Sequence, residues 1–446
     1  MTTHSERITS LSVVTSEHPA TEVRAVPQPR QYDAGILVAV LVLIGFGTVM
    51  VYSASIGVAD MKLGDPSLYL RQHLKHALVA LGGLALGMSI SYHHYRRLVY
   101  PLLGTTLILL VGVLVLGISR GFSRRWLGHG AFEFQPAELA KLAFVIYLAY
   151  SLEKKRERMR TFAVGFLPHV LVCGLLVALC LAQPDLGTCI LLGATMFAML
   201  FVAGTRLSYV VIIALVVIPL GASYIANSSR RMERMLIWLD PWRDRYDTGF
   251  QTVNALTSLG SGGYTGMGLG AGRQKMGFLT QGWTDFIFSS IGEELGLIGC
   301  AAVAVTFLYL CWRGFRAARN APDDFGRYLA FGVTALIGIQ AAWNMGVAVG
   351  LLPTKGLNLP FVSGGGSSLL VTCFAAGILL NVSRWSEAPM ALPKPKKQQK
   401  AVRGSTPKFS NAGRRKVREK RTERKPVTQH DSGVRTFVRP TNGGAA

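Results

Sequence analysis

Ten long apolar runs constrain what this chain can fold into more than any other feature of its sequence. About twenty apolar residues cross the hydrocarbon core of a bilayer as a helix, and backbone polar groups in lipid must be paired within the structure. The runs are too long for barrel strands, so we expect an all-α polytopic membrane protein with ten transmembrane helices. The predicted helices span residues 34–55, 75–92, 98–118, 136–152, 162–181, 187–204, 208–226, 286–312, 328–352 and 366–383.

The charges are segregated along the chain. Of the 446 residues, 50% are hydrophobic and 16% are charged, yet the formal net charge is +23. Residues 391–446 alone carry 16 Lys and Arg against 3 Asp and Glu. Such a segment cannot build a core. We therefore expect disordered tails at 1–33 and 387–446 on either side of one membrane domain at 34–386. The largest connection in that domain is the external loop 227–285, between the seventh and eighth helices.

Basic residues in short connections predict which side of the membrane is cytoplasmic. Arg96, Arg97, the basic run 153–160, Arg206 and Arg313 fall on the same side as the basic tail. This pattern predicts a multi-pass protein of the cytoplasmic (inner) membrane with both termini in the cytoplasm. Attraction to anionic membrane lipid is the first explanation of the tail. The alternatives are docking of an acidic cytoplasmic partner and weak nucleic-acid contact; we expect no nucleic-acid partner.

Four ionisable residues that are far apart in the chain fall near the predicted outer interface. Glu138 and Lys141 share a face at the start of the fourth helix, Asp185 precedes the sixth helix, and Asp285 opens the eighth. Charges at membrane depth are functional candidates, so these residues predict one site. The alternatives are helix capping for the two aspartates and a structural ion pair for Glu138 and Lys141.

The external loop 227–285 combines cations with glycine. Its first half contains the basic run 230–234 and Arg243, and residues 260–277 hold eight glycines in eighteen positions together with Lys275. Backbone N–H groups and guanidinium forks bind phosphate oxygens, although a flexible loop is the alternative. Residues 266–271 match a dinucleotide fingerprint only formally, since no strand precedes them, and no GxxxxGK[ST] loop is present. We therefore expect no nucleotide.

Two further segments carry unusual residues at membrane depth. Glu293 and Glu294 lie inside the eighth helix, where pairing with neighbouring helices is a simpler interpretation than catalysis. The last external segment, 350–368, contains Lys355 and is broken by prolines and glycines. Irregular backbone at this depth is tolerated only inside protein or at a cavity.

Several motifs together resemble the SEDS family of shape, elongation, division and sporulation proteins, over about residues 34–385. The segment Pro353-Thr354-Lys355-Gly356 resembles the division branch of that family more than the elongation branch. The motifs lie at residues 125–127, 134–142, 183–188, 240–242, 260–263, 284–288, 292–296 and 352–356.

The resemblance implies a peptidoglycan glycosyltransferase that polymerises lipid II at the outer face of the inner membrane, at the division septum. It implies that Asp285 is the catalytic residue, that a class B penicillin-binding protein and other division proteins are partners, and that a divalent cation, Mg or Mn, takes part. Glycosyl transfer needs a base and positive charge at the leaving pyrophosphate. The predicted substrate- or pyrophosphate-binding residues are Glu138, Lys141, Asp185, Arg125, Arg243, Lys275 and Lys355.

Two other functions compete with polymerisation. One is a transporter that flips the same lipid, and the other is a non-catalytic scaffold that recruits a penicillin-binding protein. A transporter should carry charge along a path through the bilayer. Here the acids and bases gather at the outer end, which favours the polymerase.

Overall fold

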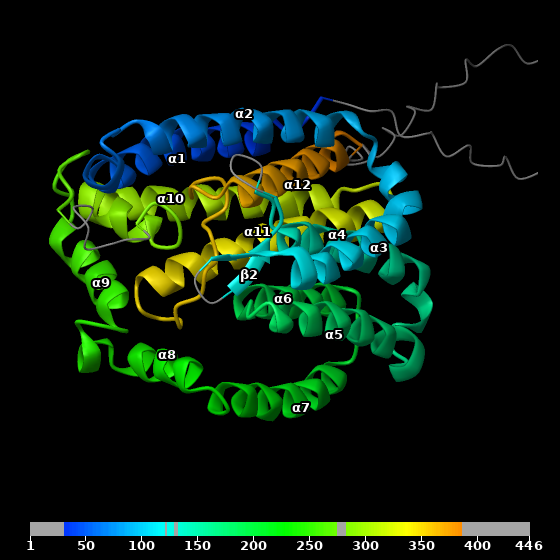
Figure 1. Ribbon diagram of the computed structural model, residues 1–446. Coiled ribbons are helices and arrows are strands. Elements are labelled where there is room, and N and C mark those ends of the chain that lie inside the picture. The colour runs from blue at the N-terminus through cyan, green and yellow to red at the C-terminus, as the bar shows by residue number, and fades with distance from the viewer. Residues whose placement is uncertain (1–30, 121–122, 129–132, 274–281, 386–446) are drawn as a thin grey trace, which may run out of the picture. The chain divides into compact units, whose positions relative to one another are not determined.

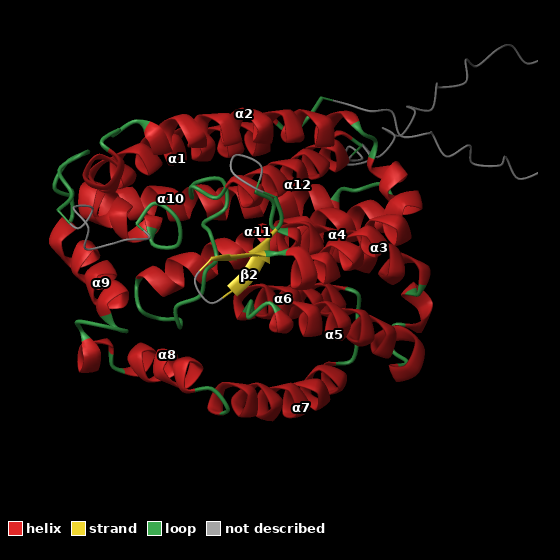
Figure 2. Cartoon of the chain, in the orientation of Figure 1, coloured by secondary structure: helices red, strands yellow, loops and turns green. Residues whose placement is uncertain are grey.

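The computed structural model describes residues 31–120, 123–128, 133–273 and 282–385 (Figure 1). Contacts group residues Met1–Ala391 into one unit and Leu392–Ala446 into another. The predicted tails at 1–33 and 387–446 therefore lie outside the described residues, apart from positions 31–33. Within the described ranges the chain is almost entirely helical (Figure 2).

Each of the ten predicted runs contains a helix. Seven of these helices are long enough and apolar enough to cross a membrane within the described ranges, namely α1, α3, α5 with its preceding turn, α7, α10, α11 and α12. The chain is therefore a polytopic helical membrane protein. The ten helices are α1 (Ala34–Leu63), α2 (Leu68–Ser89), α3 (Tyr92–Leu116), α4 (Pro136–Lys154), α5 (Leu167–Ala182), α6 (Leu186–Val202), α7 (Leu207–Ala226), α10 (Ile287–Arg319), α11 (Asp324–Ala348) and α12 (Gly366–Arg384).

Several helix boundaries differ from the prediction because polar first turns continue the helix beyond its apolar run. Helix α2 begins at Leu68, seven residues before the predicted start. Helix α11 begins at Asp324, where the side chain of Asp323 accepts a hydrogen bond from the Gly326 N–H, and it ends at Ala348. Hydropathy detects the part of a helix that lies in lipid, whereas a polar cap decides where the helix begins.

The segment 227–285, which was predicted to be one large external loop, contains regular structure. It contains α8 (Ser229–Leu239), the short 3-10 helix η3 (Pro241–Asp244) and α9 (Phe250–Gly262). A departure from the predicted all-helical fold is a hairpin of β1 (Ile118–Arg120) and β2 (Ser123–Trp126) between α3 and α4. Both were missed because short polar elements give no signal in a search for apolar runs.

Close helix packing is built on glycine. Helices α2 and α12 lie side by side (Figure 1), and a Cβ atom at Gly87 would come within 2.5 Å of the Phe374 carbonyl oxygen. A Cβ atom at Gly377 would come within 2.4 Å of the Leu84 carbonyl oxygen. Small residues let helix backbones approach closely where lipid is the solvent. Helix α7, by contrast, has no buried residue.

Helix α10 is interrupted at Gly296, whose backbone is non-helical with φ 64° and ψ −161°. Across this break α10 pairs with the glycine-rich segment that follows α9. Leu297 N–H donates to the Gly263 carbonyl at 2.9 Å, and Gly268 N–H donates to the Glu294 carbonyl at 3.0 Å. Protein acceptors and donors thus satisfy the backbone groups that the break exposes, as the low-dielectric surroundings require.

Glu294 is held structurally, in agreement with the interpretation made from the sequence. The Ser53 hydroxyl of α1 donates to both of its carboxylate oxygens, at 2.7 and 2.6 Å, and the Gly270 N–H donates to one of them at 3.1 Å. The neighbouring Glu293 accepts from the Arg273 N–H at 2.5 Å. Both side chains are buried.

Two ends of the helical bundle can be told apart by their polar contacts. We call them the Asp285 end, where α4, α6, α10 and α12 begin, and the Asp33 end, where α1, α3 and α11 begin. At the Asp33 end, Asp33 pairs with Arg313 at 2.7 Å. Asp323 accepts from the Tyr92 hydroxyl at 2.9 Å and from Arg96 at 3.1 Å.

Candidate active site

Asp285 is half-buried and lies two residues before the start of α10. Its backbone carbonyl accepts from Asn344 Nδ2 at 2.8 Å. The residue that caps α10 is Phe286, and no side chain caps this helix end. Within the described part of the chain, the Asp285 carboxylate accepts no hydrogen bond. The alternative that Asp285 serves as a helix cap is therefore wrong.

Arg125 of β2 brings positive charge to this carboxylate. Its Nη1 atom lies 3.6 Å from Asp185 Oδ1, and its Nε atom donates to the Gln183 carbonyl at 3.2 Å. A Cβ atom built on Gly356 would lie 3.4 Å from Asp285 Oδ2 and 3.9 Å from Arg125 Nη1. The structure thus brings together Asp285, Arg125 and Asp185, three of the predicted site residues.

Asp185 has two roles in this arrangement. It caps α6 through hydrogen bonds from the Thr188 N–H at 3.3 Å and the Thr188 hydroxyl at 2.9 Å. It also lies against Arg125. The capping interpretation is confirmed for this residue, and the same carboxylate orients the guanidinium of Arg125 beside Asp285.

Burial and neighbouring charges shift the pKa values of two groups at the site. Burial raises the pKa of Asp285 to about 6, an effect that Arg125 opposes and Asp185 reinforces. Burial, together with the positive charges of Arg234, Arg125 and Arg231, lowers the pKa of Lys355 to about 8. Charged forms are disfavoured in poorly solvated surroundings. A carboxyl group with a pKa near neutrality suits a general base.

Arg231 and Arg234 are site cations that the prediction of site residues missed. Both lie on α8 and act electrostatically on Lys355. Arg231 also donates to the Tyr224 carbonyl at 2.8 Å. The basic run 230–234 was recognised in the sequence, but it was assigned to an irregular loop. The alternation of cations with Met232 and Leu236 at helical spacing is the signal that identifies an amphipathic helix here.

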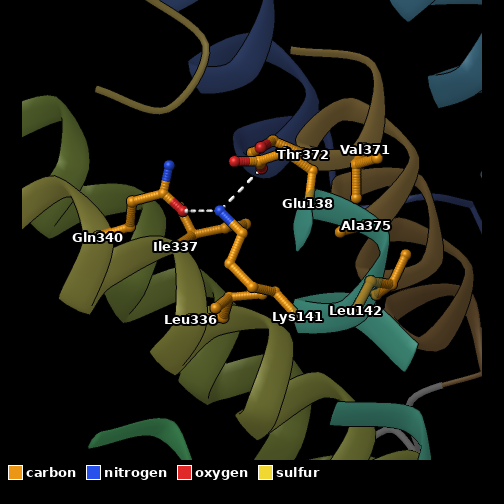
Figure 3. Close-up of a pocket in the computed structure, with 9 residues that line it drawn as sticks. All are labelled: Glu138, Lys141, Leu142, Leu336, Ile337, Gln340, Val371, Thr372 and Ala375. Atoms are coloured by element: carbon orange, nitrogen blue, oxygen red, sulfur yellow. Dashed lines mark hydrogen bonds and ion pairs between the residues drawn. The ribbon is translucent and has the colours of Figure 1, made fainter. Parts of the chain in front are cut away.

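Glu138 and Lys141 form a buried ion pair (Figure 3). Lys141 Nζ lies 2.7 Å from Glu138 Oε2 and donates to Gln340 Oε1 at 2.9 Å. The pair lines a small cavity together with apolar residues of α11 and α12. Gln340 Nε2 in turn donates to the Asn358 carbonyl at 2.9 Å. The structure thus links this pair to the segment that carries Lys355 and Gly356.

Four N–H groups in the described part of the glycine-rich segment are already bonded to Glu293 and Glu294. The N–H groups of Met267 and Gly268 donate to the carbonyls of Glu293 and Glu294, and those of Gly270 and Arg273 donate to the side chains of the same two residues. The phosphate-binding interpretation of this stretch is therefore wrong for those groups, because acidic residues at the break in α10 already occupy them.

The two remaining predicted cations are Arg243 and Lys275, and the structure describes the first of them. Arg243 is exposed on η3, and no contact given for the described residues connects it to Asp285. Lys275 lies outside the described residues. Both assignments stay predictions.

The described side chains do not form a ready-made site for a divalent cation. Within the described ranges, no three His, Cys, Asp or Glu residues converge. Asp185 already accepts from Thr188, and the guanidinium of Arg125 lies beside both aspartates at the site. Mg and Mn prefer several oxygen ligands. The participation of a divalent cation therefore stays a prediction.

The fold and site define a polytopic membrane protein with a charged, partly buried site at one end of its helical bundle. The family model for the cell cycle proteins FtsW, RodA and SpoVE matches residues 34–388. The chain belongs to this family, which is the SEDS family that the motifs predicted.

Relatives and solved structures agree with this membership. The chain is 46% identical to the probable peptidoglycan glycosyltransferase FtsW of Geobacter metallireducens, covering 79% of this chain and 95% of the relative. It is 39% identical to the stage V sporulation protein E of Bacillus subtilis, covering 79% of this chain and 97% of that protein.

Among solved structures, the rod shape determining protein RodA of Thermus thermophilus is 29% identical, with a TM-score of 0.59 over 79% of this chain and 97% of RodA. A chain of a peptidoglycan synthase complex, described as coordinating polymerization and crosslinking, is 31% identical. Its TM-score is 0.66 over 79% of this chain and 98% of that chain.

Proposed function

We propose that this chain is a peptidoglycan glycosyltransferase that polymerises lipid II into glycan strands during septal wall synthesis. One observation carries the proposal: the half-buried Asp285 carboxylate accepts no hydrogen bond within the described residues and lies beside Arg125. The names of the relatives, probable peptidoglycan glycosyltransferases, support the same reaction class.

The chemistry follows from this geometry. The hydroxyl of the acceptor sugar attacks the anomeric carbon of the donor sugar as the bond from that carbon to the pyrophosphate breaks. Asp285 takes the hydroxyl proton, which general-base catalysis requires. The leaving pyrophosphate carries the electron pair away, and Arg125, Lys355 and the α8 arginines offset its negative charge.

The remaining site residues support this reaction without taking part in bond making. Asp185 holds Arg125 in place, and the pair of Glu138 and Lys141 acts through Gln340 on the segment that carries Lys355. This assigns Lys141 a structural role, because its ammonium group is already engaged by Glu138 and Gln340.

The same proposal includes ten membrane spans and a site on the outer face. Helices α2, α4 and α6 complete the ten, because α2 and α4 have 22 and 19 residues and α6 is an apolar helix of 17 residues. The basic residues Arg96, Arg156, Arg313 and Arg327 cluster at the Asp33 end. Cytoplasmic ends carry such residues, which supports an external Asp285 end and cytoplasmic termini.

A class B penicillin-binding protein and other division proteins are the proposed partners. The related synthase complex couples polymerization to crosslinking, which supports a crosslinking partner here. The basic tail is proposed to contact anionic lipid.

The test uses purified protein in nanodiscs with labelled lipid II, with and without a class B penicillin-binding protein. A polymerase yields a ladder of glycan strands on a gel, and Asp285→Asn abolishes the ladder. A transporter would instead move labelled lipid II across a liposome membrane without forming polymer. A scaffold would yield neither product on its own.

A further inference from the structure

The irregular segment between α11 and α12 is held rigidly beside Asp285. Asn344 Nδ2 donates to the Leu357 carbonyl at 2.7 Å and to the Asp285 carbonyl at 2.8 Å. One amide group of α11 therefore ties Leu357 and Asp285 together. Leu357 N–H also donates to the Lys355 carbonyl at 2.8 Å, which closes a three-residue turn centred on Gly356.

Gly356 is the one position in that turn without a side chain, and this absence leaves a gap. A Cβ atom there would lie 3.4 Å from Asp285 Oδ2 and 3.9 Å from Arg125 Nη1. The gap is therefore bounded by the base on one side and by a cation on the other. The backbone does not require glycine at this position, because Gly356 is not among the residues with positive φ.

We infer that the gap at Gly356 seats the attacking hydroxyl of the acceptor sugar, and that Gly356 is a specificity-determining residue that keeps this space open. A general base must lie about 2.6–3.2 Å from the oxygen whose proton it takes. A methyl group 3.4 Å from Oδ2 would occupy the same volume. Asn344 is the positioning residue that sets the depth of the gap. The inference rests on the proposed polymerase function.

The first test compares Gly356→Ala with Gly260→Ala, a matched control because a Cβ atom at Gly260 meets nothing within 4 Å. Gly356→Ala should lower the turnover number at saturating lipid II by about tenfold or more, in line with the sensitivity of catalysis to small displacements. Donor binding and the melting temperature should be unchanged. Gly260→Ala should polymerise like the wild type.

A second measurement on the unmodified protein covers the case in which Gly356→Ala is unstable. Two acceptor analogues are compared for inhibition of polymerisation, one with the attacking hydroxyl removed and one with it converted to a methyl ether. The deoxy analogue should inhibit at least about tenfold more strongly, because the methyl ether does not fit the gap.

The outcomes separate this inference from the proposed function. Wild-type turnover by a stable Gly356→Ala, or equal inhibition by the two analogues, overturns the inference while leaving the polymerase intact if Asp285→Asn is inactive. Full activity of Asp285→Asn overturns both.

Discussion

Both ends of the helical bundle contain ion pairs, but the carboxylates of Asp33 and Asp285, each at the head of a helix, are held differently. At the Asp33 end, Asp33 forms an ion pair with Arg313. Asp323 forms an ion pair with Arg96 and accepts a hydrogen bond from the Tyr92 hydroxyl. At the Asp285 end, the carboxylate of Asp285 accepts no hydrogen bond within the described residues, although Arg125 lies close by. A partly buried carboxylate without such bonds is costly. Both aspartates lie at the head of a long helix, so the pairing of the carboxylate, rather than the presence of charge, distinguishes Asp285 from Asp33.

The substitution Asp285→Asn should have the largest effect on polymerisation. It removes the base while keeping the size of the side chain, so polymerisation should fall by at least about a hundredfold, the low end for loss of acid–base catalysis. Stability should be unchanged or higher, because the fold disfavours the charged form of this residue. The measurements are lipid II polymerisation and melting temperature. Near wild-type polymerisation would remove Asp285 from the catalytic role.

The rate of polymerisation should depend on pH through the ionisation of Asp285 and Lys355. Asp285 must be ionised to act as a base, and its pKa is raised to about 6, so the rate should fall about tenfold per pH unit below that value. Lys355 must be protonated to carry charge, and its pKa is lowered to about 8, so the rate should also fall above that value.

Lys355→Arg serves as the control for the pH profile, since guanidinium stays charged well above pH 8. It should extend the alkaline limb and leave the acid limb in place. An alkaline limb that does not move would show that Lys355 is not the group responsible.

Breaking the ion pair between Asp33 and Arg313 should lower stability and leave activity unchanged, the reverse of the result expected for Asp285→Asn. Asp33→Asn removes the charge that pairs with Arg313 but keeps an oxygen that can cap α1. We expect a loss of about 1 kcal/mol in the free energy of unfolding and unchanged turnover per folded molecule. A large loss of turnover without a loss of stability would show that the Asp33 end is coupled to the site.

The smallest effect is expected from removal of the basic tail. The site is proposed to lie about 30 Å of bilayer core away from the cytoplasm, so deletion of 391–446 should leave polymerisation by purified protein largely intact. The assay compares truncated and full-length protein in nanodiscs at matched amounts of folded protein. Loss of most activity would contradict the separation of bundle and tail.

The sequence predicts the positions of the helices, because these depend on local composition. The catalytic role of Asp285 is implied by the family resemblance and stays a prediction. Apolar runs locate the ten helices, and Asp285 follows from a charge at the head of such a run. The hydrogen bond that holds the buried ammonium group of Lys141 could not be predicted, since its acceptor is Gln340, almost two hundred residues further along the chain. The role of Arg234 could not be predicted either, because it depends on α8 folding as a helix near Lys355.

The break in α10 restricts where residues can be inserted into this chain. Four backbone hydrogen bonds join residues 263–268 to residues 293–298 in a fixed register. A Cβ atom at Gly266 would come within 2.2 Å of the Glu294 carbonyl oxygen. One inserted residue within 263–268 would shift the following donors by about 3.5 Å and leave polar groups unpaired at the break in α10. Insertions are therefore excluded there, whereas the exposed turn at Tyr246 can accept them, so a tag or reporter domain belongs at that turn.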